Sequence, residues 1–392
     1  MRPGTLTLLR RVLATILLSA YTLAYAELFV RIVSPQSILP RYVVGTSWGV
    51  RGNLPNARYW HHTPEVNVEY RINSEGLRAD HDYSFRKPSG TCRVAVFGDS
   101  FFMGYELDLK DTFTTQLEDL LRARGRRVEV LNFSVSGFGT AEMLRTYEAY
   151  ARRFDPDVVM FSWHYSDVDD NVRSGLFRMH SGKLENGNSS YIPGGDVQDR
   201  LLGSALYRFV ADNSQLYTLL RDRLVVFTKR MLTNLRQEHQ QLNVAPENDD
   251  GGGVDEDDLL HAAQVKANIE LSSAIVAHAA EVVAADGKDF YLVEIPMRIS
   301  RTSFRSTVEV LSAAVRSNIK VISPVAIFSK AARPDVKLYY ELGHGHFTPR
   351  AAQLLAEEAA DTLSRSARLN ACAAADGRRP ETTSRDSGGR DR

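Results

Sequence analysis

The chain has 392 residues, of which 43% are hydrophobic and 24% charged, proportions that are typical of a folded globular protein. Its 48 basic and 48 acidic side chains cancel, so no overall positive field would attract nucleic acid. The two cysteines, Cys92 and Cys372, are too few for a disulfide framework or a cysteine-based zinc site. A single bridge between them stays open.

The N-terminus predicts export across a membrane. Arg10 and Arg11 directly precede an uncharged apolar run from Val12 to Ala26. This run ends in Ala24-Tyr25-Ala26, a small-x-small pattern that suits signal peptidase. Continued through Val30, it reaches about 19 residues, near the minimum that spans a bilayer. Residues 1–33 are therefore predicted to be either a signal peptide or an uncleaved signal anchor, and both place the remaining chain outside the cytoplasm, in the periplasm or at the cell surface.

Residues 34–91 predict a small entry module that packs on the main domain. They are rich in turn formers and aromatic residues. The segment Val66–Ile72 alternates like a strand, and Asn73-Ser74-Glu75-Gly76 closes it with turn-forming residues.

From Cys92 onward, short apolar runs alternate with segments of helical spacing. This alternation predicts a three-layer α/β/α domain with a central parallel sheet over residues 92–368. Strands are expected at 93–97, 128–133, 157–163, 290–295 and 320–322, and helices at 107–124, 140–154, 259–286, 304–317 and 349–367.

Two segments depart from this alternation. Residues 171–258 are predicted to be a helical insertion, with helix mainly over Leu201–Leu242 and a disordered acidic, glycine-rich loop over Glu247–Asp258. Residues 369–392 are predicted to be a disordered tail, because their composition is polar and rich in Gly, Arg and Ser.

Reactive residue types collect at the expected carboxyl ends of the strands, where ligands bind in such sheets. Gly98-Asp99-Ser100 follows the first strand, and Ser134–Gly139 follows the second. Tyr165–Asn171 follows the third, and Gly343–Pro349 precedes the last helix. We expect these four blocks to meet at one edge of the sheet.

The four blocks resemble those of the SGNH (GDSL-type) hydrolase superfamily over roughly residues 70–365. The resemblance implies the flavodoxin-like fold of that superfamily and a serine esterase mechanism without a cofactor. It implies that Ser100 is the nucleophile, that His346 is the general base, and that the N–H groups of Ser100 and Gly137 form the oxyanion hole. The nucleophile needs such a base because a serine hydroxyl is a poor nucleophile by itself.

The sequence departs from the superfamily in two blocks. Ser166 stands where the third block normally has an asparagine that donates to the oxyanion, and a hydroxyl can donate one hydrogen bond in its place. Gly343 and His344 stand where the last block normally has an aspartate. The group that orients His346 is therefore open, with Asp167, Asp170, Glu341 and a backbone carbonyl as candidates.

These observations predict an extracytoplasmic serine esterase or O-acyltransferase that acts on acyl esters. The resemblance favours O-acetylated glycans as substrates, with the membrane contacted through the N-terminal helix. One alternative is a catalytically degenerate domain that binds a glycan or scaffolds an envelope complex. Another is a membrane-tethered assembly factor that uses the 171–258 insertion. No metal, nucleotide cofactor or nucleic acid is expected, since no metal-ligand spacing or dinucleotide motif is present.

Overall fold

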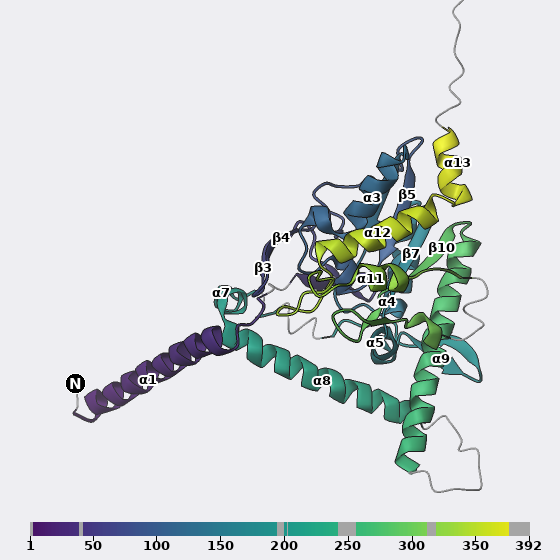
Figure 1. The fold of residues 1–392 in the computed structure, drawn as a ribbon. Coiled ribbons are helices and arrows are strands. Elements are labelled where there is room, and N and C mark those ends of the chain that lie inside the picture. The colour runs from purple at the N-terminus through teal and green to yellow at the C-terminus, as the bar shows by residue number, and fades with distance from the viewer. Residues whose placement is uncertain are drawn as a thin grey trace, which may run out of the picture.

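The computed structural model describes residues 3–38, 42–193, 200–201, 203–241, 256–311 and 319–375 (Figure 1). Its centre is a five-stranded parallel sheet with the order β13-β10-β7-β5-β6. The strands are β5 (Cys92–Phe97), β6 (Val128–Asn132), β7 (Val158–Trp163), β10 (Asp289–Glu294) and β13 (Lys320–Ile322). The chain places β6 on one side of β5 and β7 on the other. The crevice beyond the carboxyl ends of β5 and β7 is therefore the switch point at which such sheets bind ligands.

Helices cover both faces of this sheet, which confirms the predicted three-layer α/β/α fold. Val94 and Val96 of β5 point to the face that α3 (Phe113–Ala123) and α12 (Pro349–Leu363) cover. Ala95 and Phe97 point to the opposite face, because side chains alternate along a strand. That face is covered by α4 (Thr140–Ala149), α5 (Asp167–Ser174) and α9 (Glu256–Ala285).

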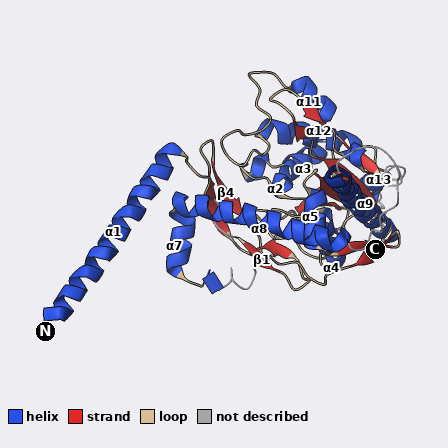
Figure 2. Ribbon diagram, turned by 90° about the horizontal axis from the view of Figure 1, so that it is seen from below, coloured by secondary structure: helices blue, strands red, loops and turns tan. Residues whose placement is uncertain are grey.

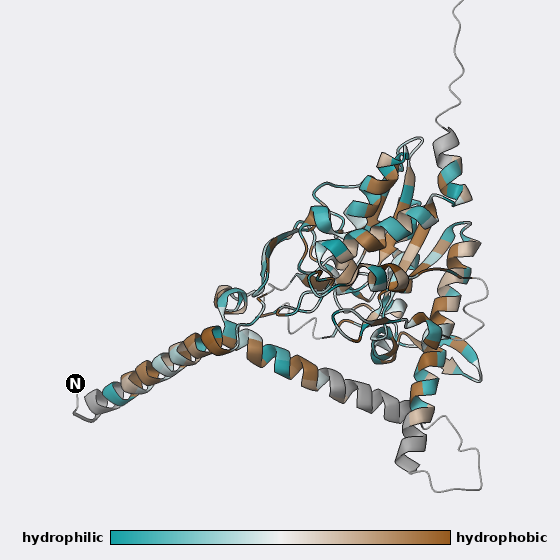
Figure 3. Ribbon diagram, viewed as in Figure 1, coloured by the Kyte–Doolittle hydropathy of each residue, from teal (hydrophilic) through white to brown (hydrophobic). Residues whose placement is uncertain are grey.

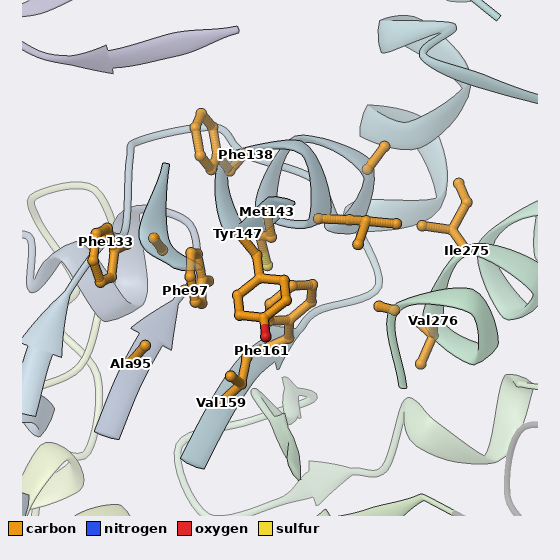
Figure 4. Packing of buried hydrophobic residues seen from close by; sticks show 14 of the residues in the cluster. Ala95, Phe97, Phe133, Phe138, Met143, Tyr147, Val159, Phe161, Ile275 and Val276 are labelled. Carbon is orange, nitrogen blue, oxygen red and sulfur yellow. The ribbon is translucent and has the colours of Figure 1, made fainter. Parts of the chain in front are cut away.

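An aromatic cluster fills the second face near the carboxyl ends of the strands (Figure 4). Phe97 stacks on Phe133 with ring centroids 5.0 Å apart, and it lies 5.1 Å from Phe161. Full burial of each such side chain stabilises the fold by roughly 1.5–3 kcal/mol. The cluster fixes the ends of β5, β6 and β7, from which the reactive loops begin.

The entry segment folds into two antiparallel strand pairs. β1 (Val43–Gly45) pairs with β2 (Arg51–Asn53), and β3 (Arg58–His62) pairs with β4 (Asn67–Arg71). A separate core joins this segment to the main domain through side chains from both, namely Tyr42, Val68, Tyr70, Ile72, Met103 and Tyr105.

The insertion is only partly helical. A hairpin of β8 (Phe177–His180) and β9 (Lys183–Asn186), which the sequence did not predict, comes before α7 (Ala205–Asn213) and α8 (Gln215–Gln241). Both helices lie in the segment that was predicted to be mainly helical. The predicted loop at 247–258 falls outside the described residues up to 255, and its last residues already belong to α9.

Two sequence predictions near the C-terminus are wrong in part. The helix predicted at 304–317 is replaced at its start by β12 (Phe304–Arg305) and a 3-10 turn at Val308–Val310, because Glu294 accepts the N–H groups of Thr307 and Val308. Residues 312–318 lie outside the described part. The tail predicted from 369 begins instead as α13 (Ala367–Ala375), which buries Leu369 in the core. Residues 376–392 lie outside the described part.

The N-terminal helix α1 (Pro3–Val33) projects away from the globular part (Figures 1 and 2). It contains a stretch, Arg10–Val33, that is long and apolar enough to cross a membrane, and none of its most apolar window is buried. Figure 3 shows this helix and the start of α8 meeting at one junction, from which the two helices diverge.

Candidate active site

Ser100 lies at the point where β5 turns into the short helix α2 (Ser100–Met103). Asp99 caps this helix by accepting the N–H of Phe101 at 2.9 Å. The turn requires glycine at position 98, because a Cβ there would lie 2.6 Å from Cβ of Phe102 and 2.7 Å from Oγ of Ser162. The half-buried Ser100 hydroxyl is thereby held at the crevice between β5 and β7.

His346 reaches this hydroxyl from the loop before α12. Its Nε2 atom lies 2.7 Å from Oγ of Ser100, although 246 positions separate the two residues. The loop is anchored at Thr348, which caps α12 and donates its N–H to the carbonyl of Leu338. The ring is only 7% exposed and packs against Phe101, whose centroid is 4.6 Å away. The predicted nucleophile and base therefore form a hydrogen-bonded pair.

The carboxylate beside His346 belongs to Glu106, which the sequence did not single out. Oε2 of Glu106 lies 3.4 Å from Nδ1 of His346 and also accepts the N–H of His346 at 3.2 Å. Oε1 accepts the N–H of His344 at 3.0 Å. The Nδ1 contact is longer than an ideal charge-assisted hydrogen bond, yet catalytic hydrogen bonds are often long in the free enzyme.

Gly343 explains how this carboxylate fits. A Cβ at position 343 would collide with Oε1 of Glu106. Position 343 is one of the two at which the resemblance leads one to expect an aspartate. The Glu106 carboxylate therefore occupies the space that a side chain on the last block would otherwise take.

The surroundings of Glu106 favour its ionised form. Burial alone would raise its pKa, but the His346 ring and the N–H groups of His344 and His346 outweigh burial, so the pKa lies below the ordinary value. Burial lowers the pKa of the neighbouring His344, and it lowers that of His61 to about 3. These two rings stay neutral at physiological pH, and the Glu106 charge is left to act on His346.

The backbone at Glu106 has φ +65°, an uncommon conformation for a residue with a side chain. The entry segment supports it. The Tyr70 hydroxyl accepts the N–H of Glu106 at 3.0 Å. The buried guanidinium of Arg78 donates to the carbonyls of Met103, Gly104 and Leu107, on both sides of Glu106.

The loop that carries Gly137 is held by a second arginine of the entry segment. Arg51 donates to the carbonyl of Gly137 at 2.6 Å and to that of Ser136 at 3.3 Å. The same guanidinium forms an ion pair with Glu142, whose side chain is fully buried and also accepts the N–H of Gly139. Gly137 has φ +76°, in the region that favours glycine. Arg51 binds the carbonyls of Ser136 and Gly137, so it fixes the orientation of the peptide groups on both sides of residue 137.

The third block brings His164 to the site as well as Ser166. Nδ1 of His164 accepts the N–H of Ser166 at 3.3 Å, and the Ser166 hydroxyl lies 2.8 Å from the same atom. Since Nδ1 is the acceptor, the hydroxyl donates to it and the ring proton of neutral His164 is on Nε2. Burial lowers the pKa of His164, so the neutral ring is the relevant form. Its ring lies 5.5 Å from that of Phe101.

The three carboxylates considered from the sequence have other partners in the structure. Oδ2 of Asp167 accepts the N–H of His164 at 3.3 Å. Asp170 pairs with Arg173 of the same helix. Glu341 pairs with two arginines, Arg298 and Arg301. The structure therefore brings Ser100 and His346 together with Glu106, and no local sequence pattern distinguishes Glu106 from other acidic residues.

Comparison with known proteins gives matches among solved structures. No family model matches the chain, and neither does any curated protein. One match is a putative lipolytic protein of the G-D-S-L family from Desulfitobacterium hafniense, with 10% identity and a TM-score of 0.34 over 69% of this chain and 99% of the other.

Two further matches are esterases. The esterase EstA from Pseudoalteromonas sp. has 13% identity and a TM-score of 0.33 over 70% of this chain and 97% of the other. A catalytic mutant of Axe2, an acetylxylan esterase from Geobacillus stearothermophilus, has 11% identity and a TM-score of 0.36 over 71% and 97%. The chain is thus similar to lipolytic proteins of the G-D-S-L family and to esterases.

Proposed function

We propose that the chain is a serine esterase or O-acyltransferase that uses Ser100, His346 and Glu106 as a catalytic triad. The observation that carries this proposal is the 2.7 Å contact between Oγ of Ser100 and Nε2 of His346, with a buried carboxylate on the other ring nitrogen. In this arrangement His346 takes the proton of Ser100 as the hydroxyl attacks an ester carbonyl. Glu106 orients the ring and stabilises the imidazolium that forms.

The oxyanion of the tetrahedral intermediate would be bound by backbone N–H groups of Ser100 and Gly137. Preorganised donors of this kind each contribute roughly 3–4 kcal/mol to transition-state stabilisation. A third donor would come from the third block. The sequence nominates the Ser166 hydroxyl, but this group donates to His164, so we propose that Nε2–H of His164 supplies the third donor and that Ser166 orients its ring.

Collapse of the intermediate breaks the bond to the alcohol oxygen, the protonated His346 gives its proton to the leaving alcohol, and an acyl group is left on Ser100. Water or a sugar hydroxyl then attacks that ester, with His346 as base, and the choice decides between hydrolysis and acyl transfer. The resemblance of the four sequence blocks to the SGNH superfamily supports acyl esters, and O-acetylated glycans in particular, as substrates.

The proposed location is outside the cytoplasm, with α1 as a signal anchor. It is supported by the arginines before the apolar run and by the exposed apolar window of α1. When α1 is retained, the Glu27 side chain, which caps α8, links it to the folded domain.

The alternative of a degenerate, non-catalytic domain rests on the loss of both the third-block asparagine and the last-block aspartate. A carboxylate near the His346 ring argues against it, because a binding domain has no need for a buried charge at that point.

The test is covalent trapping of the nucleophile. A fluorophosphonate should label the wild-type chain at Ser100, as located by mass spectrometry of the peptides, and Ser100→Ala should not be labelled. In a second experiment, untreated enzyme is given a chromogenic acetyl ester with and without a xylo-oligosaccharide acceptor. Acetylated oligosaccharide identifies transfer, and free acetate alone identifies hydrolysis. Labelling at another residue, or equal labelling of Ser100→Ala, would contradict the proposed site.

A further inference from the structure

An apolar stripe runs along the exposed face of α8. Leu220, Leu224, Phe227 and Met231 are all more than half exposed, and their spacing of three or four residues puts them on one side of the helix. Buried Thr218 marks the opposite side. Isolated exposed apolar residues are ordinary on a protein surface, but a contiguous stripe of large side chains indicates an interaction surface.

The adjacent helix α7 extends this surface. Leu206 is 73% exposed and Phe209 is 66% exposed, and they are three positions apart on the same helix. The hydroxyl groups of Tyr207 and Tyr217 lie 2.8 Å apart and join α7 to α8. We refer to the six side chains as the apolar stripe, made up of Leu206, Phe209, Leu220, Leu224, Phe227 and Met231.

The stripe begins where the apolar helix α1 ends. The carboxylate of Glu27, near the end of α1, accepts the N–H groups of Gln215 and Leu216 and the hydroxyl of Ser214, so that it caps α8. Arg31 donates to the carbonyl of Asn213. An acidic group at a helix N-terminus is favourable because it meets unpaired N–H groups and the positive end of the helix dipole. The start of α8 is therefore held at the membrane end of the chain.

Both views show α8 turning away from the line of α1 at this junction instead of continuing along it (Figures 1 and 2). With α1 placed across a bilayer, this turn directs α8 away from the span and toward the bilayer surface. The composition of α8 suits that position, with five basic residues, namely Arg221, Arg223, Lys229, Arg230 and Arg236, against two acidic ones. Helices that lie in the membrane interface combine an apolar face with basic residues in this manner.

We propose that the apolar stripe lies in the surface of the bilayer that α1 crosses. This inference rests on the proposed role of α1 as an anchor. The stripe residues enter the boundary between headgroups and acyl chains on the outer leaflet, and the Glu27 cap fixes the position of α8 relative to the span. The lipid surface is favoured over a protein partner because the stripe is continuous with a segment that itself lies in lipid.

The placement has a consequence for the enzyme. Helix α8 packs against α5, which begins at Asp167 in the third block of the site. The helix that contacts the membrane on one side thus borders the active site on the other. The proposed docking would hold the reacting serine close to the membrane surface and favour substrates that are delivered there.

The test is depth-dependent quenching of tryptophan fluorescence in the full chain, reconstituted in vesicles of brominated phosphatidylcholine. The reporter is Phe227→Trp, which keeps an aromatic side chain at an exposed position. Leu17→Trp, exposed in the middle of α1, reports the span, and Arg365→Trp, exposed after α12, reports the part of the domain remote from it. The wild-type chain gives the background of the three native tryptophans.

We expect lipids with bromine near the headgroup to quench Phe227→Trp strongly, lipids with bromine deep in the acyl chains to quench Leu17→Trp, and neither to quench Arg365→Trp. If Leu17→Trp is quenched and Phe227→Trp behaves like Arg365→Trp, the docking proposal is wrong while the anchor stands. That result would point to a protein partner for the stripe. If neither Leu17→Trp nor Phe227→Trp is quenched, both the anchor proposal and the docking proposal are wrong. The esterase proposal is tested separately and is not affected by this result.

Discussion

Replacement of Glu106 tests the proposed triad at the residue that the sequence did not reveal. Glu106→Gln keeps the shape of the side chain and removes its charge. Oε2 of Glu106 lies 3.4 Å from Nδ1 of His346, a separation at which opposite unit charges attract by about 5 kcal/mol at an effective dielectric constant near 20. Part of this attraction also acts in the resting enzyme, so the loss in the transition state is smaller.

We therefore expect kcat for p-nitrophenyl acetate to fall by roughly 10²–10³, which corresponds to about 3–4 kcal/mol. This is less than the roughly 10⁴ that loss of a triad acid can cost, because the Nδ1 contact here is long. KM should change little, since Glu106 does not contact the substrate. The assay is the initial rate of p-nitrophenol release across a range of ester concentrations.

A rescue variant separates catalysis from folding. Gly343→Asp alone should destabilise the chain and lower activity, because its side chain collides with Glu106. Glu106→Ala removes that obstacle, so Glu106→Ala/Gly343→Asp should fold. The kcat of this double variant should be at least about tenfold higher than that of Glu106→Ala, because the effects of substitutions at contacting residues are strongly coupled.

The same double variant can also exclude Glu106 as the group that orients His346. Purely additive effects of the two substitutions would mean that the carboxylate near His346 is dispensable or that Gly343 does not mark its space. Unchanged kcat in Glu106→Gln, with an unchanged melting temperature, would remove Glu106 from the mechanism.

Three further predictions concern the loops around the site. Arg51→Met leaves the buried Glu142 carboxylate unpaired and should lower the free energy of unfolding by about 3–5 kcal/mol, measured by urea unfolding. Arg51→Met/Glu142→Gln should recover stability but not kcat, since the hydrogen bonds from Arg51 to the Gly137 loop are still lost. Burial raises the pKa of Asp167 above that of an ordinary aspartate, so the folded chain loses stability as the pH rises above that ordinary pKa. Asp167→Asn should therefore have a higher melting temperature than the wild type at pH 8 and no higher a melting temperature at pH 4, as measured by differential scanning fluorimetry. His164→Ala should lower kcat more than Ser166→Ala does, because the first removes the proposed oxyanion donor and the second only its orienting partner, and equal losses would contradict this order.

The parallel sheet was predictable because strands that are buried on both faces appear in the sequence as continuous apolar runs. β5 is buried at every position. A run such as Arg93–Phe97, followed by a glycine and then by helical spacing, is typical of a strand, a tight turn and a helix in a parallel α/β sheet. The loops that carry Ser100, Gly137 and His346 followed from the same argument, since each lies next to a strand end or a helix start, and the roles of the three residues were implied by the resemblance to the SGNH superfamily.

Glu106 could not be found in this way. It lies six residues after Ser100 in a loop of unusual backbone conformation, and its position depends on Arg78 and Tyr70 of a segment that precedes the main domain. The glycine at position 343, where an aspartate is expected, indicates that another group orients His346. Only the contact in the structure identifies that group as Glu106.

The hairpin β8–β9 and the start of α13 were missed for a related reason. The side chains of the hairpin are polar at most positions. The start of α13 is ordered by contacts with a distant element, such as that of Leu369 with the core beside β5. The helix predicted at 304–317 failed because the buried carboxylate of Glu294 binds the backbone there and ends the expected periodicity.

The most direct test of Ser100 as the nucleophile and His346 as its base is the pre-steady-state burst of p-nitrophenol from p-nitrophenyl acetate, with the full chain in detergent beside Ser100→Ala and His346→Ala. We expect a burst of one p-nitrophenol per chain in the wild type, since an acetyl group accumulates on Ser100, and no burst in either variant. A burst of equal size in Ser100→Ala would contradict the assignment of Ser100 as the nucleophile.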